Sequence, residues 1–405
     1  MSNTAIIVGA GVTGLTAATQ LVDAGWHVTL LEGNDRIGGR TFTQKNGSAL
    51  EEQGAEFFHP DHHPRLATLM AKLHLASLPV EDSTTFWVDG PQERAGNPSK
   101  PSIQTLCAEI DQDVSLIDPD RWISEMNRHL DLPFAHYLER YSAHPSVIAE
   151  FLAWTGTLTG ADPREYSALG LLRDFKMFGS TLQALTARES RIAGGTGQLA
   201  QSLAAALPHP IEFNAKVSSV KSTADGFEVR IGAGRQLSSS AVIITTPFNT
   251  LHRLRFPGQT ETLTTASRLG HANRSHKHWF NPETPFAPRI ANRPTSLCYL
   301  EASETAGCII ASEDIPAQSA AAGLALPETP LAHARGHFWQ KDPMAGGAWM
   351  TLRPGQAAIL DELQQRNQQH PRCLIAGADV SPIWPGWIEG ALHAGSAAAS
   401  NLLAT

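Results

Sequence analysis

The sequence predicts an α/β fold in which a Rossmann-like domain is interleaved with a second, α+β domain. Three observations predict it. The chain has 405 residues, more than one ordinary domain needs. A strand, a glycine-rich turn, a helix and a second strand follow one another at the N-terminus. Glycine-rich turns and apolar strand patterns return in residues 190–255 and again in residues 345–405.

The composition favours an enzyme that acts on a small molecule. Hydrophobic residues make up 42% of the chain and charged residues 17%, as in globular proteins. A net charge of -8 gives no reason to expect a nucleic acid or an anionic membrane as partner. We expect no membrane-spanning helix, because no apolar run is long enough. Four widely separated cysteines fit a reducing, cytoplasmic setting. The oligomeric state stays open, a homodimer included.

The N-terminal motif predicts a dinucleotide site. Residues 5–8 are an apolar run typical of a buried strand, and a helix is expected from Leu15 to Ala24. Between them, Gly9 permits a tight turn, Gly11 lets the backbone approach a pyrophosphate, and Gly14 lets the helix pack closely.

An acidic residue completes this unit. Glu32 ends the next strand, where its carboxylate can accept hydrogen bonds from ribose hydroxyls. A strand, turn, helix and terminal acid in this order predict dinucleotide binding far better than the glycines alone.

Later motifs resemble the flavin amine oxidase family of the monoamine oxidase type. They are RIGGR at 36–40, GAEF at 54–57, GHANRSHK at 270–277 and IAGAD at 375–379. The resemblance implies FAD, with its diphosphate along the first motif and its isoalloxazine near the second. It further implies contacts to the adenine, the ribityl chain and the pyrimidine. The implied contact residues are Gly38, Gly39, Arg40, Gly54, Ala55, Glu56, Val217, Gly377, Asp379, Trp387 and Ile388.

The same resemblance implies the residues of the reacting end. Lys277 falls where the family has a lysine that holds a water against flavin N5. Trp349 and Trp387 fall where it has two aromatic rings that flank the amine and orient its lone pair. Ala348 falls where mitochondrial monoamine oxidases carry the cysteine that attaches to the flavin. Because alanine forms no thioether, we expect non-covalent FAD.

The activity implied by the resemblance is amine oxidation. A hydride passes from the carbon next to the amine nitrogen to flavin N5, and water hydrolyses the resulting imine. Dioxygen then takes the electrons and yields hydrogen peroxide. A FAD-dependent desaturase or porphyrinogen-type oxidase acting on C–C or ring C–H bonds is the alternative. Thr157 stands where bacterial oxidases of nicotine derivatives have an asparagine facing the pyridine ring, which argues against such substrates.

The domain boundaries follow from these motifs. Residues 1–75, 190–255 and 345–405 are assigned to the FAD-binding domain, and residues 76–189 and 256–344 to the substrate domain. Within the first domain, strands are predicted at 215–220, 227–231 and 241–247, and a helix at 388–403.

No metal site is expected. His62 and His63 are adjacent, so they would point apart, and Pro60 and Pro64 mark a loop around them and His59.

Overall fold

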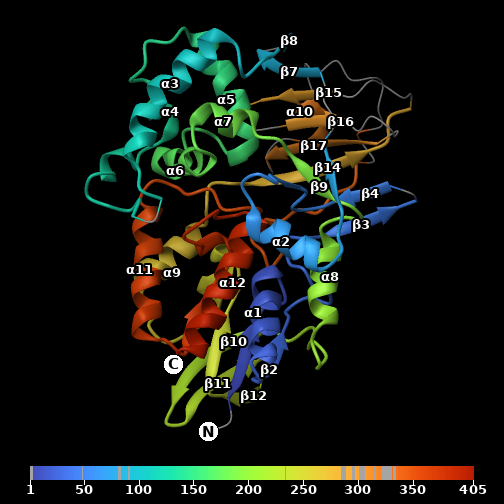
Figure 1. Ribbon diagram of the computed structural model, residues 1–405, viewed down its shortest axis with the longest axis vertical. Helices are drawn as coiled ribbons and strands as arrows, with labels where there is room; N and C mark the ends of the chain where they lie inside the picture. Colours follow the sequence, from blue (N-terminus) through green and yellow to red (C-terminus); the bar gives the residue numbers. More distant parts are fainter. Residues whose placement is uncertain are drawn as a thin grey trace.

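The computed structural model describes residues 3–405 apart from 48, 81–83, 90–91, 120, 233, 284–288, 294–296, 301–305, 313–315, 322–330 and 332–333. The molecule is elongated, and both termini lie at one end of its long axis (Figure 1). A parallel sheet with its helices forms the half that holds the termini. A larger sheet and a group of helices form the other half.

The half with the termini is built around a four-stranded parallel sheet in the order β18-β13-β1-β2. Its strands are β1 (Thr4–Val8), β2 (His27–Leu31), β13 (Ala241–Ile244) and β18 (Cys373–Ile375). Most of their residues are buried, which explains why they are continuous apolar runs in the sequence. Three segments that are distant in the chain meet in this one sheet, so the predicted interleaved α/β fold is confirmed.

Helix α1 (Val12–Asp23) lies between α12 (Ile388–Leu403) and α8 (Gly197–Ala205) and contacts both (Figure 1). Helices α1 and α12 approach closely because a small residue lies between them. A Cβ added to Gly395 would come within 2.5 Å of the Thr13 carbonyl oxygen. Helix α1 begins at Val12 rather than at the predicted Leu15, because Gly11 is its N-cap and the glycine turn leads directly into the helix.

A small antiparallel sheet extends from this half. It consists of β10 (Val217–Thr223), β11 (Gly226–Ile231) and β12 (Arg235–Ser239). Alternation of apolar and polar residues predicted the first two strands. Strand β12 was missed because its sequence, RQLSS, is polar and mostly exposed.

The other half contains a six-stranded sheet in the order β14-β17-β16-β15-β7-β8. Its strands are β7 (Thr84–Asp89), β8 (Gln92–Ala95), β14 (Ser275–Phe280), β15 (Arg289–Asn292), β16 (Leu297–Leu300) and β17 (Gly307–Ser312). All neighbouring strands are antiparallel except β15 and β7. The sheet thus joins two distant segments of the chain, and the assignment of a separate substrate domain stays a prediction.

Helices lie beside this sheet (Figure 1). They are α3 (Pro101–Leu116), α4 (Phe134–Leu138), α5 (Pro145–Thr159), α6 (Ala168–Phe178), α7 (Thr181–Thr186) and α10 (Ala317–Ala321). Helices α9 (Glu261–Leu269) and α11 (Gln356–Gln369) lie beside α12 in the half that holds the termini (Figure 1), where α11 contacts β18. The remaining elements are α2 (Pro64–Lys72), the hairpin β3 (Thr43–Asn46) and β4 (Ala49–Glu52), and a sheet of β5 (Phe57–Phe58), β9 (Ser190–Ile192) and β6 (Ser77–Pro79).

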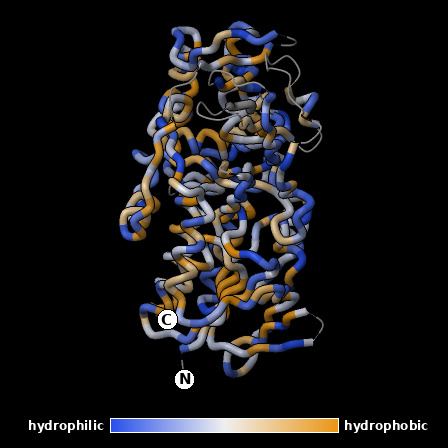
Figure 2. The backbone as a smooth tube through the Cα atoms, turned by 90° about the vertical axis from the view of Figure 1, so that its right-hand side faces the viewer, coloured by the Kyte–Doolittle hydropathy of each residue, from blue (hydrophilic) through white to orange (hydrophobic). Residues whose placement is uncertain are grey.

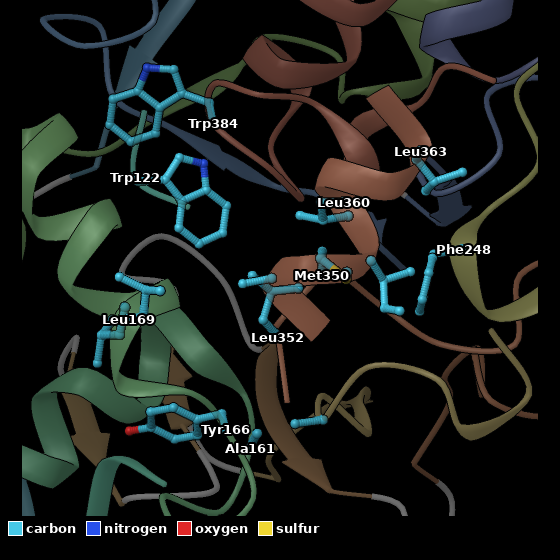
Figure 3. Close-up of a cluster of buried hydrophobic side chains, with 14 of the residues drawn as sticks. Trp122, Ala161, Tyr166, Leu169, Phe248, Met350, Leu352, Leu360, Leu363 and Trp384 are labelled. Carbon is cyan, nitrogen blue, oxygen red and sulfur yellow. The ribbon is translucent and has the colours of Figure 1, made fainter. Parts of the chain in front are cut away.

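One hydrophobic cluster connects the two halves (Figure 3). It includes Leu169 of α6, Leu360 of α11 and Trp384 from the loop before α12. A second cluster fills the space between the parallel sheet and its helices, where Figure 2 shows strongly hydrophobic segments in the interior. Burial of this shared apolar surface fixes the halves relative to each other. Within the described part of the chain, no helix is both long and apolar enough to cross a bilayer.

Candidate active site

A cavity of about 500 Å³ extends from the turn after β1 to strands β14 and β15 and helix α5. Every predicted site residue except Gly14 lines it. Gly14 lies behind the turn instead, where an added Cβ would come within 1.9 Å of the Gly9 carbonyl oxygen. Its predicted role, close packing of the helix against the turn, agrees with that position.

The end of the cavity near the parallel sheet is lined by glycine backbone. Gly38 and Gly39 have φ values of 91° and 57°, and Gly38 N donates to Ala10 O at 2.9 Å. Gly11 and Gly38 form a parallel bridge, so the two glycine loops lie side by side. Because Gly11 at the N-cap has no side chain, the N–H groups of the first turn of α1 are left for a ligand. This arrangement is suited to an anionic group.

Glu32 lies beside this cradle and is anchored to it. Its Oε2 accepts from Ala10 N at 2.8 Å and its Oε1 from Asn34 N at 2.8 Å. Burial raises the pKa of Glu32, although these hydrogen bonds oppose the shift. Val217, at the start of β10, lines the same part of the cavity.

Arg40 connects three loops around the middle of the cavity. Its Nη1 forms an ion pair with Asp379 Oδ1 at 2.7 Å and also donates to the carbonyl oxygen of Ala348. Asp379 Oδ2 accepts from Phe248 N at 2.9 Å. Burial alone would raise the pKa of Asp379, but the Arg40 charge holds it below its ordinary value. Asp379 is therefore a buried carboxylate that fixes the arginine.

Lys277 lies at the other end of the cavity, on β14, and is only 5% exposed. Its Nζ forms an ion pair with Glu56 Oε2 at 2.5 Å. Arg191 Nε of β9 forms a second ion pair with Glu56 Oε1 at 2.8 Å. One carboxylate thus bridges two cations. A buried lysine requires an anionic partner, but sequence reasoning did not identify Glu56 as that partner because it is 221 positions away.

The loop that carries Glu56 is itself held by the RIGGR segment. Ala55 N donates to Arg40 O at 2.9 Å. A Cβ added to Gly54 would come within 2.0 Å of the same oxygen, so only glycine fits this close approach. The loop therefore connects the glycine cradle to the lysine.

Trp349 and Trp387 both line the cavity and are carried by adjacent loops. Gly386 has a φ of 81°, and a Cβ there would lie 3.3 Å from the Cβ of Trp349. Trp349 Nε1 donates to Leu158 O of α5 at 2.8 Å. The Trp387 ring lies 5.1 Å from that of His59. The two indoles are thus fixed by different parts of the fold.

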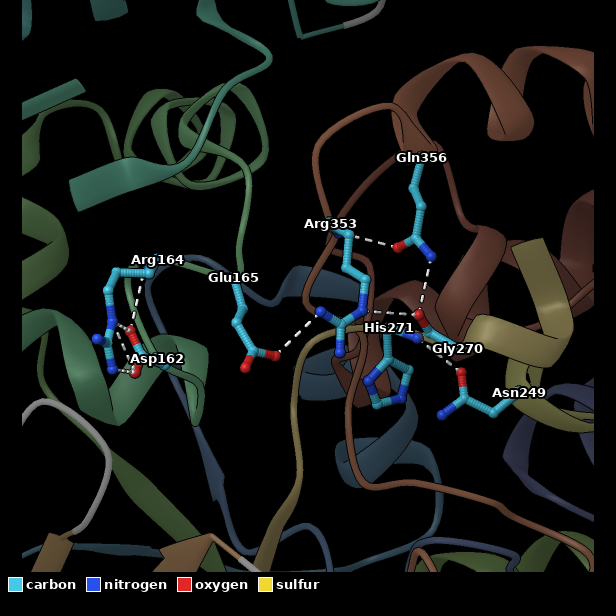
Figure 4. A network of polar contacts seen from close by, with 8 residues as sticks. All are labelled: Asp162, Arg164, Glu165, Asn249, Gly270, His271, Arg353 and Gln356. Carbon is cyan, nitrogen blue, oxygen red and sulfur yellow. Dashed lines mark hydrogen bonds and ion pairs between the residues drawn. The ribbon is translucent and has the colours of Figure 1, made fainter. Parts of the chain in front are cut away.

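A polar network joins Asn249, the Gly270–His271 segment and Arg353 (Figure 4), and Asn249 connects it to the loop that carries Trp349. Asn249 Nδ2 donates to Gly346 O at 2.9 Å, and Asn249 Oδ1 accepts from His271 N at 2.9 Å. Arg353 donates to Gly270 O at 3.2 Å and binds Glu165 Oε2 at 3.0 Å. Burial lowers the pKa of His271 to about 4, so this histidine is neutral at pH 7.

The sequence did not predict several further residues of the cavity wall. Apart from Thr157 and His59, which were noted for other reasons, no motif identified them. They are Trp154, Leu158, Glu189, Arg191, Ile290, Asn292 and Ile310.

Two of the wall residues are titratable. Burial raises the pKa of Glu189 to about 7, with the nearby Glu56 acting in the same direction. Burial lowers the pKa of His59 to about 4. The described residues contain no group of three or more His, Cys, Asp or Glu side chains that could hold a metal ion.

Comparison with known proteins assigns a family to this site. The sequence matches the family described as flavin containing amine oxidoreductase over residues 12–300 and 325–403. It is 27% identical over 424 residues to (S)-6-hydroxynicotine oxidase of Paenarthrobacter nicotinovorans, covering 98% of this chain and 99% of that protein. Pseudooxynicotine dehydrogenase of a Pseudomonas species is 24% identical over 433 residues, covering 96% and 84%.

Solved structures support the same fold. Cyclohexylamine oxidase from Brevibacterium oxydans has a TM-score of 0.83 at 21% identity, covering 99% of both chains. Putrescine oxidase bound to putrescine has a TM-score of 0.81 at 20% identity, covering 100% of both chains. The predicted family resemblance is confirmed.

Proposed function

Since the chain belongs to the flavin-containing amine oxidoreductase family, we propose that it binds FAD without a covalent link and oxidises a small-molecule amine. Dioxygen is the electron acceptor, and hydrogen peroxide is a product. One observation carries the proposal. A single cavity has an anion-binding glycine cradle at one end and Lys277, Trp349 and Trp387 at the other.

The residues of the cavity fit FAD. Gly11, Gly38 and Gly39 leave room for a diphosphate beside the start of α1, where N–H groups favour an anion. Glu32 is positioned beside this cradle to accept hydrogen bonds from a ribose. The N-terminus of α12, at Ile388, borders the cavity and can stabilise negative charge on a flavin ring. When bound, the flavin accepts the hydride from the substrate carbon and passes the electrons to dioxygen.

The protein supplies orientation and charge for this chemistry. Trp349 and Trp387 would flank the amine, turn its lone pair toward the reacting carbon and exclude water. The amine reacts as the neutral base, because a protonated nitrogen has no lone pair to support loss of a hydride. Lys277 Nζ would hold a water by hydrogen bonding at this end of the cavity, and Glu56 keeps the ammonium group in place.

Ala348 supports non-covalent binding. Its side chain is a methyl group in the cavity wall, next to Trp349, and has no atom that could bond to a flavin. After acid precipitation of the purified protein, we expect the yellow colour in the supernatant. Colour that remains with the precipitated chain would contradict this expectation.

The alternative reaction, oxidation of C–C or ring C–H bonds, is disfavoured by the charges at the reacting end. Lys277, Glu56, Arg191 and Glu189 lie together there, and an extended apolar substrate would displace water from these charged groups without offering them hydrogen bonds. The named relatives are also oxidases or dehydrogenases of amines.

A survey of amines by peroxide release tests the proposed function. Aromatic, aliphatic and cyclic amines, primary and secondary, are supplied to the FAD-loaded protein in air. We expect at least one class to produce hydrogen peroxide. If no class of amine released hydrogen peroxide although the protein had a normal flavin spectrum, the result would favour the alternative reaction.

We further infer a cytoplasmic enzyme. Within the described chain, Cys107 and Cys373 are free and buried, which suits a reducing compartment. The homodimer stays a prediction, which size-exclusion chromatography would test.

A further inference from the structure

The loop between β5 and α2 carries three histidines, His59, His62 and His63, that have no part in the proposed reaction. Two of them are buried, since His59 is 2% exposed and His63 is 0% exposed. The Nε2 atoms of these two are buried without a hydrogen-bond partner among the described residues. An unpaired buried polar atom costs about 1–3 kcal/mol. Two such atoms in one loop therefore indicate a role other than stability.

Hydrogen bonds fix the tautomer of both buried rings. The carbonyl oxygen of Arg188 can only accept, so His59 Nδ1, 3.1 Å from it, carries the proton. His63 Nδ1 accepts from His59 N at 3.2 Å, so it carries none. Burial lowers the pKa of His59 to about 4 and lowers the pKa of His63 well below its ordinary value. Both imidazoles are therefore neutral at pH 7, each in a single tautomer.

The two neutral rings pack against Trp387, one of the two indoles at the proposed reacting end. The centroid of the Trp387 ring lies 5.1 Å from that of His59 and 5.1 Å from that of His63, with an interplanar angle of 61° in both pairs. Such edge-to-face pairs contribute about 0.5–1.5 kcal/mol beyond the burial of their area. Trp387 itself is partly exposed and lines the cavity. The buried imidazoles therefore hold an indole that is open to the cavity.

Glu389 fixes the histidine loop relative to Trp387. It is 0% exposed and belongs to the first turn of α12, of which Trp387 is the N-cap. Its Oε1 accepts from Arg65 N at 3.1 Å, and its Oε2 accepts from Leu66 N at 2.9 Å. These amides are in the first turn of α2, where they have no partner within the helix. The starts of α2 and α12 are thus joined directly beside the histidines.

His59 also contacts the chain that leads into β9. The carbonyl that accepts from its Nδ1 belongs to Arg188, two residues before β9 begins. Arg191 of that strand forms the ion pair with Glu56 at the reacting end. A rotation of the His59 ring would break its hydrogen bond to the backbone. His59 therefore connects Trp387 to the charged part of the cavity and cannot turn freely between them.

We propose that His59 is a positioning residue for amine oxidation, which holds the Trp387 ring in the orientation that aligns the amine. The imidazole supplies the surface against which the indole packs, and its Nδ1–H fixes the imidazole to the backbone before β9. A displacement of about 1 Å in such a site can lower a rate about a hundredfold. Loss of the ring should thus affect the reaction more than amine binding. This inference rests on the proposed function and adds a residue on which its rate depends.

The test is anaerobic flavin reduction in the FAD-loaded enzyme, followed by stopped flow with benzylamine, cyclohexylamine and 2-phenylpyrrolidine. His59→Asn keeps a donor near the position of Nδ1 but removes the ring. With the amine that the wild type oxidises fastest, we expect the limiting reduction rate to fall at least about tenfold, equivalent to about 1.4 kcal/mol, while the apparent Kd changes less than about threefold. His59→Phe keeps a ring but loses the donor, so its rate should fall only about threefold.

A double-mutant cycle separates positioning from a general loss of structure. In a Trp387→Ala background the indole that His59 holds is gone, so His59→Asn should change the limiting rate by less than about twofold. His62→Asn is the matched control. The ring of His62 contacts Phe178 and Trp384, and no ring contact joins it to Trp387 within the described structure. This control should keep the wild-type rate.

The inference is overturned if His59→Asn keeps the wild-type rate, if it slows the reaction equally without Trp387, or if His62→Asn slows it as much. It is also overturned if His59→Phe is as slow as His59→Asn. If His59→Asn does not load FAD, the same cycle is run with His59→Phe, whose smaller loss must likewise disappear without Trp387. Failure of every amine to reduce the flavin of the wild type would instead contradict the proposed function itself.

Discussion

The two ends of the cavity are built in different ways. At the glycine cradle, backbone atoms of short, local motifs form the surface, and each loop lies within a few residues of a strand or helix that orients it. At the reacting end, side chains from β9, β14, β15 and α5 converge, and ion pairs to Glu56 connect β9 with β14. The cradle therefore depends on the absence of side chains, whereas the reacting end depends on their charge and partners. Substitutions at the cradle should therefore affect mainly FAD binding, whereas substitutions at the reacting end should affect mainly the reaction and the ion pairs.

The largest effect on FAD binding is expected from a methyl group placed behind the cradle, at Gly14. Gly14→Ala would place Cβ 1.9 Å from the Gly9 carbonyl oxygen, so helix α1 or the turn must move. We expect FAD affinity to fall at least about a hundredfold, roughly 2.7 kcal/mol. The measurement is a flavin titration of the apoprotein. Gly234→Ala is the matched control, because a Cβ there meets no described atom within 4 Å and should change nothing. Full FAD loading of Gly14→Ala would contradict the packing argument.

Removal of the Lys277 charge should not change FAD binding at the glycine cradle. Lys277→Met keeps the length of the side chain but removes its ammonium group, so FAD should still bind. We expect reoxidation of the reduced enzyme by oxygen to slow at least about tenfold, or roughly 1.4 kcal/mol of barrier. Stopped-flow mixing with oxygen measures this rate. The exposed Lys72→Met is the control. A normal reoxidation rate in the FAD-loaded variant would contradict this role of Lys277, and Arg274 would be tested next.

Substitution of Glu56, the carboxylate that bridges Lys277 and Arg191, tests whether the ion pairs contribute more to stability than to catalysis. Glu56→Gln keeps the shape of the side chain but leaves Lys277 and Arg191 without their shared anion. Removal of one partner from a buried ion pair costs about 3 kcal/mol or more, so the denaturant midpoint should fall clearly. Reoxidation should slow less than in Lys277→Met, because the ammonium group is retained. An unchanged midpoint would show that the pairs contribute little to stability.

The smallest expected effect concerns pH. Burial raises the pKa of Glu189 to about 7, so its folded-state pKa exceeds its unfolded value of about 4.5. The stabilising contribution is complete below the unfolded pKa and is lost as the pH rises through about 7. Glu189→Gln should therefore be more stable than the wild type at pH 8, on the order of 1 kcal/mol, and equal or less stable at pH 5. If the stability difference between Glu189→Gln and the wild type were the same at pH 5 and pH 8, Glu189 would not be the source of the pH dependence.

The same contrast explains what the sequence could predict. Gly9, Gly11 and Glu32 belong to one continuous strand–turn–helix–strand unit, so local patterns were sufficient to locate them. Lys277 was located by family resemblance, but its pairing with Glu56 depends on tertiary packing between distant segments. Local periodicity contains no information about such a contact.

Asn292 shows the limit most clearly. In the sequence it is one asparagine in a short strand with no motif around it. Its place beside the cavity follows from the register of β14, β17, β16 and β15, which exists only in the folded chain. Strand β12 was missed for a simpler reason, since a polar, exposed edge strand has no apolar alternation to detect.

Arg40 gives the cradle and the aromatic residues a common support. It sits in the RIGGR loop, forms an ion pair with Asp379 and holds the carbonyl of Ala348, the residue before Trp349. A ligand that orders this guanidinium therefore also orders the loop of the tryptophan. Thermodynamic linkage makes such coupling reciprocal: whatever tightens amine binding when FAD is present must tighten FAD binding by the same factor when the amine is present. A cell that supplies substrate would thereby slow the loss of cofactor from its own enzyme, and starvation for the amine would leave more apoprotein.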